Sequence, residues 1–149
     1  MTSFGDSANN NHSALGHLRV LDLAGPEGHY CGKFFADLGA DVVKVEPLEG
    51  DPSRYVGPFA GDIADPERSL YFINFNTNKK SLTLDITSGA GRDNLLRLVP
   101  TADVLVESFR PSVMPSLGLS YEALAQVNPR LVMTSISNFG QDGPYRDFE

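Results

Sequence analysis

The segment Ser108-Phe109-Arg110-Pro111 holds the side chains best suited to bind an anionic ligand. It follows an apolar run, so Arg110 would leave the end of a strand into a proline turn, where a guanidinium can donate two hydrogen bonds to phosphate oxygens. Phe109 beside it could stack on a purine ring. From residue types alone the simpler alternative is favoured, a surface arginine next to a core phenylalanine.

A second candidate is the glycine-rich turn Gly25–Gly32, which follows the first apolar run. Dinucleotide-binding folds hold a pyrophosphate at this place, but the glycine spacing here is not G-x-G-x-x-G, and Pro26 has no amide hydrogen to donate. Glu46, at the end of the next apolar run, could mimic the acid that binds a ribose. The spacing alone therefore favours a plain tight turn over NAD binding.

Other chemistry has weaker support. The link Asn76–Ser81 contains two lysines that could attract a phosphate, although a solvated turn is the commoner explanation. The three histidines and Cys31 do not have metal-ligand spacing, so we expect no metal. Three carboxylates end predicted strands, but nothing pairs any two of them as an acid and a base: Asp22, Asp85 and Glu107.

The elements that position these residues follow from the pattern of apolar residues. Predicted strands are Leu18–Leu23, Asp41–Val45, Ser81–Ile86, Asp103–Glu107 and Leu131–Ser137. Predicted helices are His29–Leu38, with an apolar stripe at Tyr30, Phe34 and Leu38, Arg92–Val99, capped by Thr87 or Ser88, and Tyr121–Val127, capped by Ser120. This alternation is typical of an α/β fold with a mainly parallel sheet and helices on both faces.

Two segments fit this pattern less well. Pro47–Ser69 has several prolines and glycines and is predicted to be a long loop, which in a compact domain indicates function or mobility. Leu70–Phe75 is a further apolar run. Because ligands of open α/β sheets lie beyond the carboxyl ends of the strands, the candidate site falls on the segments after them. These are Ala24–Gly28, Glu46-Pro47, Ile86-Thr87, Ser108–Arg110 and Ser137–Gly140.

Composition bounds the class of protein. The chain has 149 residues, 41% of them hydrophobic, which fits one soluble globular domain after a disordered leader at 1–16. Its net charge of −7 argues against nucleic acid as a partner. No apolar run approaches the ~20 residues of a membrane helix, so we expect no membrane partner. The single cysteine fits a reducing compartment, and we expect a cytoplasmic location.

Taken in order, these segments resemble the family III CoA-transferases, the group of formyl-CoA transferase, carnitine CoA-transferase and the 2-methylacyl-CoA racemases. The matching stretches begin with LRVLDLAGPEGHYCGKFFADLGADVVKVEPLEGDPSR at Leu18, continue from FNTNKKSLTLDITSGAGRDNLLRLV to RLVMTSIS, and end with FGQDGPY. The resemblance implies a Rossmann-like large domain that binds coenzyme A. Residues 17–149 would be the N-terminal, incomplete part of that domain.

The resemblance also implies which residues contact CoA: Gly28, His29, Leu84, Asp85, Ile86, Thr87, Ser108, Phe109 and Arg110. The chain departs from the family at two positions. Pro47 and Ser116 stand where some members carry an arginine. Arg110 would then have to offset the charge of the diphosphate, with Arg54 and Lys79 as the further candidates.

The activity implied is transfer of CoA from an acyl-CoA to a carboxylic acid acceptor, in a homodimer and without a metal. The family's nucleophile is an aspartate downstream of the segment matching FGQDGPY, so we expect the catalytic residue to lie beyond Glu149 and none within this chain. Two alternatives stay open. One is a fragment of a 2-methylacyl-CoA racemase, distinguished by a histidine beyond residue 149. The other is a non-catalytic CoA- or nucleotide-binding module, distinguished by a CoA-binding test.

Overall fold

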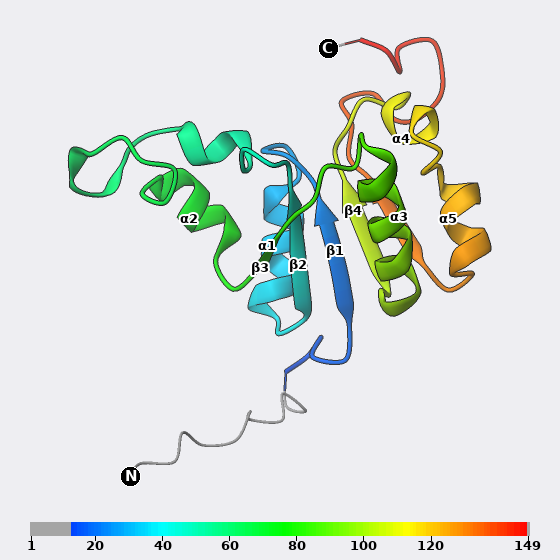
Figure 1. Cartoon of the computed structure of the whole chain (residues 1–149), viewed down its shortest axis with the longest axis horizontal. Helices are drawn as coiled ribbons and strands as arrows, with labels where there is room; N and C mark the ends of the chain where they lie inside the picture. The colour runs from blue at the N-terminus through cyan, green and yellow to red at the C-terminus, as the bar shows by residue number, and fades with distance from the viewer. Residues whose placement is uncertain (1–12, 149) are drawn as a thin grey trace.

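The computed structural model describes residues 13–148 and contains a five-stranded sheet in which every neighbouring pair of strands is parallel (Figure 1). The order is β3-β2-β1-β4-β5. This confirms the predicted parallel α/β fold, and the order is the one found in doubly wound nucleotide-binding folds. The strands are β1 (Arg19–Leu23), β2 (Asp41–Glu46), β3 (Lys80–Thr83), β4 (Val104–Glu107) and β5 (Val132–Ser135).

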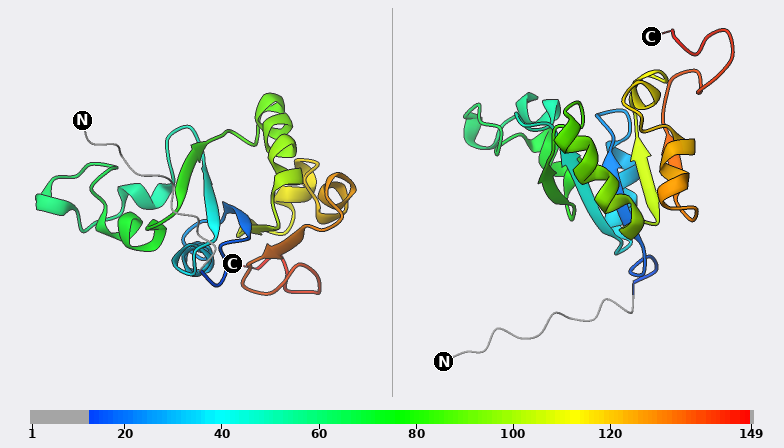
Figure 2. Two further views of the ribbon diagram at one scale, coloured as in Figure 1. Left: turned by 90° about the horizontal axis from the view of Figure 1, so that it is seen from below. Right: turned by 45° about the vertical axis from the view of Figure 1, so that its right-hand side comes forward.

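Helices cover both faces of the sheet, as the two turned views show (Figure 2). On one face α1 (His29–Asp37) packs Ala36 against Val20 and Val42. On the other face a second apolar core joins the strands to α3 (Gly89–Leu98), α4 (Val113–Ser116) and α5 (Tyr121–Val127). Because central strands are buried on both faces, they are apolar runs rather than alternating ones.

Three helices begin at a serine whose hydroxyl accepts a hydrogen bond from a backbone amide. Ser120 caps α5 as predicted, and of the two predicted candidates Thr87 and Ser88 it is Ser88 that caps α3. Ser69 caps α2 (Leu70–Asn76) by accepting from the amide of Phe72 at 3.0 Å. The apolar run Leu70–Phe75 is therefore helical.

The remaining differences from the sequence pattern are local. The long loop between β2 and α2 contains two short 3-10 turns, Pro52–Tyr55 and Ala60–Asp62, and a third, Val99–Thr101, follows α3. Strand β3 ends at Thr83 instead of Ile86. Of the predicted leader, residues 13–16 form a turn in which the Leu15 amide donates to the Leu38 carbonyl, and the rest lies outside the described residues.

The apolar stripe of α1 faces outward. Tyr30 is 52% exposed and Phe34 is 54% exposed, whereas the buried positions of this helix include Gly32 and Ala36. A Cβ on Gly32 would overlap the carboxylate of Asp22. Small residues thus let α1 lie close to the sheet, and its large apolar side chains remain at the surface.

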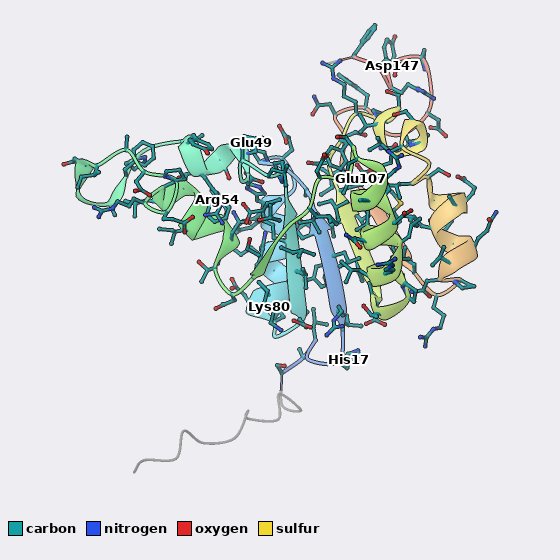
Figure 3. The ribbon with its side chains drawn as sticks, viewed as in Figure 1. His17, Glu49, Arg54, Lys80, Glu107 and Asp147 are labelled. Carbon is teal, nitrogen blue, oxygen red and sulfur yellow. The ribbon has the colours of Figure 1, made fainter. Side chains whose placement is uncertain are left out.

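Parallel strands place all their carboxyl ends at one edge of the sheet, the upper edge in Figure 1. Glu49 and Glu107 lie toward this edge, whereas His17 and Lys80 lie at the opposite one (Figure 3). Within residues 13–148, no helix has the length and apolar character needed to cross a membrane.

Candidate functional site

A cavity of about 330 Å³ opens at the carboxyl edge, where the strand order reverses between β1 and β4. Ligands of doubly wound sheets bind at this reversal. The cavity wall is built from the segments that follow four strands: Leu23–Glu27, Val45–Pro47 with Asp51-Pro52, Leu84–Thr87, and Ser108-Phe109, together with Val113 and Leu117.

The turn after β1 is fastened to the turn after β4. The amide of Gly25 donates a hydrogen bond of 2.8 Å to the hydroxyl of Ser108. Gly28, at the start of α1, packs so closely that a Cβ would lie 2.6 Å from the Cβ of Ala24 and 3.1 Å from Ile136. A larger residue at this position would push α1 away from the sheet edge and so displace the turn that forms part of the cavity wall.

The segment after β3 makes a compact turn at the cavity wall. Asp85 accepts hydrogen bonds from the amide and the hydroxyl of Thr87, at 2.9 and 2.6 Å. These two bonds hold the pKa of Asp85 below its usual value. Gly91 in α3 lies directly against this turn, because a Cβ there would overlap the carbonyl oxygen of Asp85.

A second, neighbouring cavity of about 530 Å³ shares Glu27, Ser108 and Phe109 with the first. Its other walls are the turn after β4 and two parts of the segment after β5, which give it polar and charged lining residues. They include Arg110, Ser112, Ser137, Asn138, Arg146 and Asp147.

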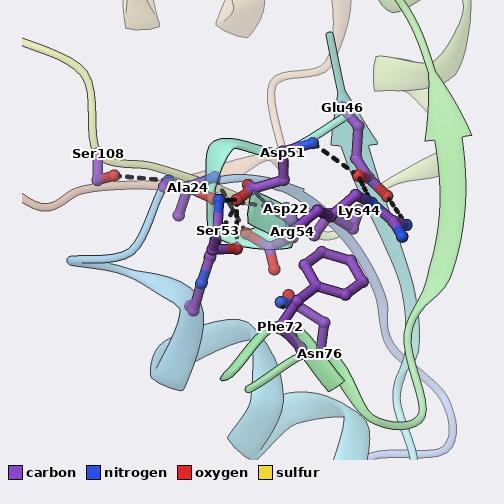
Figure 4. A network of polar contacts seen from close by, with 12 residues as sticks. Asp22, Ala24, Lys44, Glu46, Asp51, Ser53, Arg54, Phe72, Asn76 and Ser108 are labelled. Carbon is purple, nitrogen blue, oxygen red and sulfur yellow. Dashed lines mark hydrogen bonds and ion pairs between the residues drawn. The ribbon is translucent and has the colours of Figure 1, made fainter. Parts of the chain in front are cut away.

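A buried ionic network joins segments that line the first cavity (Figure 4). The ammonium of Lys44, in β2, donates to the carbonyl of Ala24 and pairs with Asp51, each at 2.8 Å. Asp51 also accepts from Nε2 of His29 at 3.1 Å and from the amide and hydroxyl of Ser53. Burial opposes ionisation of Asp51, but His29, Lys44 and Ser53 together hold its pKa far below the usual range.

A second buried pair joins β1 to the link before β3. Lys79 contacts Asp22 at 2.7 Å and also donates to the His29 carbonyl and the Asn76 side chain, each at 2.9 Å. Burial lowers the pKa of Lys79, and the carboxylate of Asp22 opposes this. Its three donor hydrogens are therefore used within the fold.

The third group of charges lies at the end of β2. Glu46 accepts two hydrogen bonds from Arg54, at 2.6 and 2.9 Å, and one each from Ser81 and the Asp51 amide. Although burial opposes it, this set of donors lowers the pKa of Glu46 to about 2. Arg54 also contacts Glu67 at 2.8 Å and covers the ring of Phe72. The structure thus engages Arg54, like Lys79, in internal ion pairs.

The structure brings together most of the residues that the sequence singled out. Six line the 330 Å³ cavity: Leu84, Asp85, Ile86, Thr87, Ser108 and Phe109. Arg110 lines the neighbouring cavity. Gly28 and His29 line neither; His29 is fully buried, and its Nδ1 has no hydrogen-bond partner among the described residues.

Sequence reasoning missed Lys44 and Asp51, although one signal for Lys44 was present. In a strand, alternate residues share a face, so Lys44 lies on the same face as the core residue Val42. A lysine at such a position needs a buried acid, and Asp51 supplies it from a loop. Within residues 13–148, no three His, Cys, Asp or Glu side chains gather closely enough to hold a metal ion.

Comparisons with known proteins agree on one family. The family model described as CoA-transferase family III matches residues 15–149. Succinyl-CoA:(R)-benzylsuccinate CoA-transferase subunit BbsE of Thauera aromatica is 45% identical over 127 residues, 85% of this chain and 31% of that protein. Succinyl-CoA–D-citramalate CoA-transferase of Chloroflexus aurantiacus is 43% identical over 89% of this chain and 33% of that protein. Succinate–glutarate CoA-transferase of Agrobacterium fabrum is 41% identical over 93% and 36%.

Solved structures give the same result. A CAIB/BAIF family protein from Brucella suis superposes with a TM-score of 0.83 at 38% identity, over 91% of this chain and 36% of that one. Rv3272 from Mycobacterium tuberculosis superposes with a TM-score of 0.80 at 36% identity, again over 91% and 36%. The chain therefore spans about a third of the length of the relatives that it matches.

Proposed function

Because this chain belongs to the family III CoA-transferases, we propose that it supplies the CoA-binding sheet edge of an enzyme that transfers CoA from an acyl-CoA to a carboxylic acid. The observation that carries the proposal is the 330 Å³ cavity. Its wall contains both Leu84–Thr87 and Ser108-Phe109, two separate segments that the resemblance assigns to CoA contacts. Gly28 and His29 line neither cavity, and they stay in the proposal only as positions that the resemblance assigns to CoA.

The lining of this cavity suits the uncharged parts of CoA. Leu23, Val45, Ile86 and Phe109 provide apolar contact, and the ring of Phe109 offers a face on which a purine can stack. The names of the relatives support a proposal for the acceptor acid. The three named above act on succinate or succinyl-CoA together with a second dicarboxylic acid. We therefore propose dicarboxylic acids and their CoA thioesters as the substrate class.

The proposed chemistry uses an aspartate outside this chain. Its carboxylate attacks the thioester carbonyl, which releases CoA thiolate and leaves a mixed anhydride. The CoA thiolate then attacks the aspartyl carbonyl of the anhydride, which releases the donor acid and forms an aspartyl-CoA thioester. The acceptor carboxylate attacks this thioester and again releases CoA thiolate, which attacks the acceptor's carbonyl in the second anhydride, so that the acceptor's CoA thioester forms and the aspartate is regenerated. No ATP is needed because one thioester replaces another. The transferase names of the relatives favour this reaction over the racemase alternative. We further propose that the enzyme is a homodimer, which the exposed apolar side chains of α1 support. We propose a cytoplasmic location for it.

The test is calorimetric titration of CoA into the 149-residue chain and into a Phe109→Ala variant. Loss of a stacked aromatic ring should weaken CoA binding by about tenfold. Phe109→Leu, which keeps the packing against the core, should show most of this loss in a protein of wild-type stability. Val127→Ala removes an exposed apolar side chain of α5 and should bind CoA as the wild type does. A folded wild-type chain that binds no CoA would refute the proposal.

A further inference from the structure

The charges around the first cavity do not match the whole of CoA. CoA carries a diphosphate and a 3′-phosphate, both of them negatively charged. The inference below rests on the proposed function, in which CoA is the ligand. The charged residues that line the 330 Å³ cavity, within the described chain, are all acids: Glu27, Glu46, Asp51 and Asp85. No described lysine or arginine lines this cavity, so none of its side chains offsets the charge of the phosphate groups, and we expect those groups to bind beside a cation elsewhere.

Three cations near the sheet edge are held by buried or partly buried acids. Lys44 pairs with Asp51, Lys79 with Asp22, and Arg54 with Glu46. Freeing any of them for a ligand would leave a buried carboxylate without its counter-ion, which is costly. The phosphates therefore need other cations.

Two arginines border the adjoining cavity. Arg110 comes from the turn after β4, and Arg146 comes from the segment after β5. Both line the 530 Å³ cavity, which shares three wall residues with the first, and both also line a third hollow of about 470 Å³. The two side chains thus converge from separate parts of the chain on the same space.

The surroundings of Arg146 leave it able to bind a ligand. Its one ion pair among those described here is with its sequence neighbour Asp147, at 3.4 Å between exposed atoms, and such pairs are weak. The flanking residues Tyr145 and Phe148 contact each other and Phe139, with ring centroids 5.4 to 6.4 Å apart. These ring contacts fix the backbone on both sides of Arg146 and reduce the entropy lost on binding.

We propose that Arg146 acts with Arg110 to bind the phosphate groups of CoA in the 530 Å³ cavity, while the apolar cavity beside it holds an uncharged part of the same molecule. Arg146 then takes over the charge that the family's arginines at the positions of Pro47 and Ser116 would provide. The segment after β5 becomes one wall of the ligand site.

The experiment is calorimetric titration of CoA and of dephospho-CoA into the full 149-residue chain and its variants. Arg146→Gln should weaken CoA binding roughly five- to tenfold, and Arg146→Lys should recover part of this loss because a lysine cannot reproduce the guanidinium fork. Arg130→Gln makes the same change of charge at an exposed residue before β5 and should bind CoA as the wild type does. A smaller loss with dephospho-CoA would assign Arg146 to the 3′-phosphate, and an equal loss to the diphosphate.

The outcomes separate this inference from the proposed function. Absence of CoA binding by the folded wild type would refute the proposed function. If the wild type binds CoA and Arg110→Ala weakens it, but Arg146→Gln does not, the inference about Arg146 is wrong. The inference is also wrong if Arg146→Gln weakens the binding of succinate and leaves the binding of CoA unchanged. Far-ultraviolet circular dichroism of each variant checks the fold, and the lysine variant decides the question if the glutamine variant unfolds.

Discussion

Buried acids at the end of β2 are ionised because the fold surrounds each of them with donors. Glu46 accepts from Arg54, Ser81 and a backbone amide, which together outweigh the cost of burial. An arrangement of this kind contributes stability only while the acid is charged, so stability should depend on pH.

Acidification should therefore destabilise the chain in a defined window. The pKa of Glu46 is lowered from 4.5 to about 2 in the folded state. A depressed pKa stabilises the fold above the unfolded value, and that contribution is lost as the pH falls from about 5 to about 2. Glu46 alone should account for on the order of 3 kcal/mol. Urea unfolding measured at several pH values checks this.

A matched pair of variants assigns the effect to Glu46. Glu46→Gln should be less stable than the wild type at neutral pH and should lose less stability on acidification, because the titrating group is gone. Glu49→Gln changes an exposed acid three residues away and should keep the wild-type slope. Parallel pH profiles for the wild type and Glu46→Gln would show that other carboxylates dominate.

Among the elements, those governed by local signals could be predicted from the sequence. Ser120 caps its helix as expected, and Ser88 is one of the two caps expected for α3, because a cap needs only the three residues that follow it. The sequence of Leu70–Phe75 did not distinguish a strand from a helix, because a short apolar run fits either. Its helix depends on the Ser69 cap and on packing of Phe72 beneath Arg54, from a distant loop.

The residues of the candidate site likewise fall into those that could be predicted from the sequence and those that could not. Ile86-Thr87 and Ser108-Phe109 could be placed at the cavity because parallel strands bring their carboxyl ends to one edge, whereas Leu84 and Asp85 were expected there only from the family resemblance. The partners of Lys79 and Arg54 could not be predicted. Asp22 lies 57 positions from Lys79 along the chain, and only the three-dimensional fold brings them together.

A substitution in helix α3 can test how closely this helix packs against the cavity wall. Gly91→Ala would place a Cβ onto the carbonyl of Asp85, so we expect a loss of roughly 1–3 kcal/mol in the free energy of unfolding. The same variant should weaken CoA binding, because the Asp85 turn must move.

Gly89→Ala is the control within the same helix. The nearest atom to its Cβ would be Arg92 Nη2, at 3.9 Å, so the added methyl group meets ordinary space. Alanine favours helix over glycine, and this variant should be neutral or slightly stabilised. Equal effects of the two substitutions in thermal unfolding would contradict the close contact between α3 and Asp85.

At the scale of the whole molecule, apolar side chains lie on the surface as well as in the two cores. We define the outer apolar surface as Tyr30 and Phe34 of α1, Leu38 directly after this helix, and Leu70 and Ile73 of α2, all of them exposed. The rings of Tyr30 and Phe75 join the two helices, with centroids 5.9 Å apart. Exposed apolar patches of this kind commonly mark protein interfaces.

We therefore expect the chain to associate in solution at micromolar concentrations. Size-exclusion chromatography with light scattering should give a mass above 16.2 kDa that rises with concentration. Replacing Phe34 and Leu38 with serine should shift the population toward the monomer. Val127→Ser removes an exposed apolar side chain of α5, outside this surface, and should leave the mass unchanged. A wild-type chain that stays monomeric at all concentrations would contradict the expectation.

The contacts of Lys44 also have an evolutionary consequence. Its ammonium donates a hydrogen bond to the Ala24 carbonyl and forms an ion pair with Asp51. These contacts join the loop after β1 to the loop after β2, two walls of the same cavity. A relative that loses the acid at the position of Asp51 would leave the ammonium buried without a counter-ion, so it should also have replaced the lysine. The two loops should therefore change together among relatives, and a new ligand preference should arise by paired substitutions rather than by single ones.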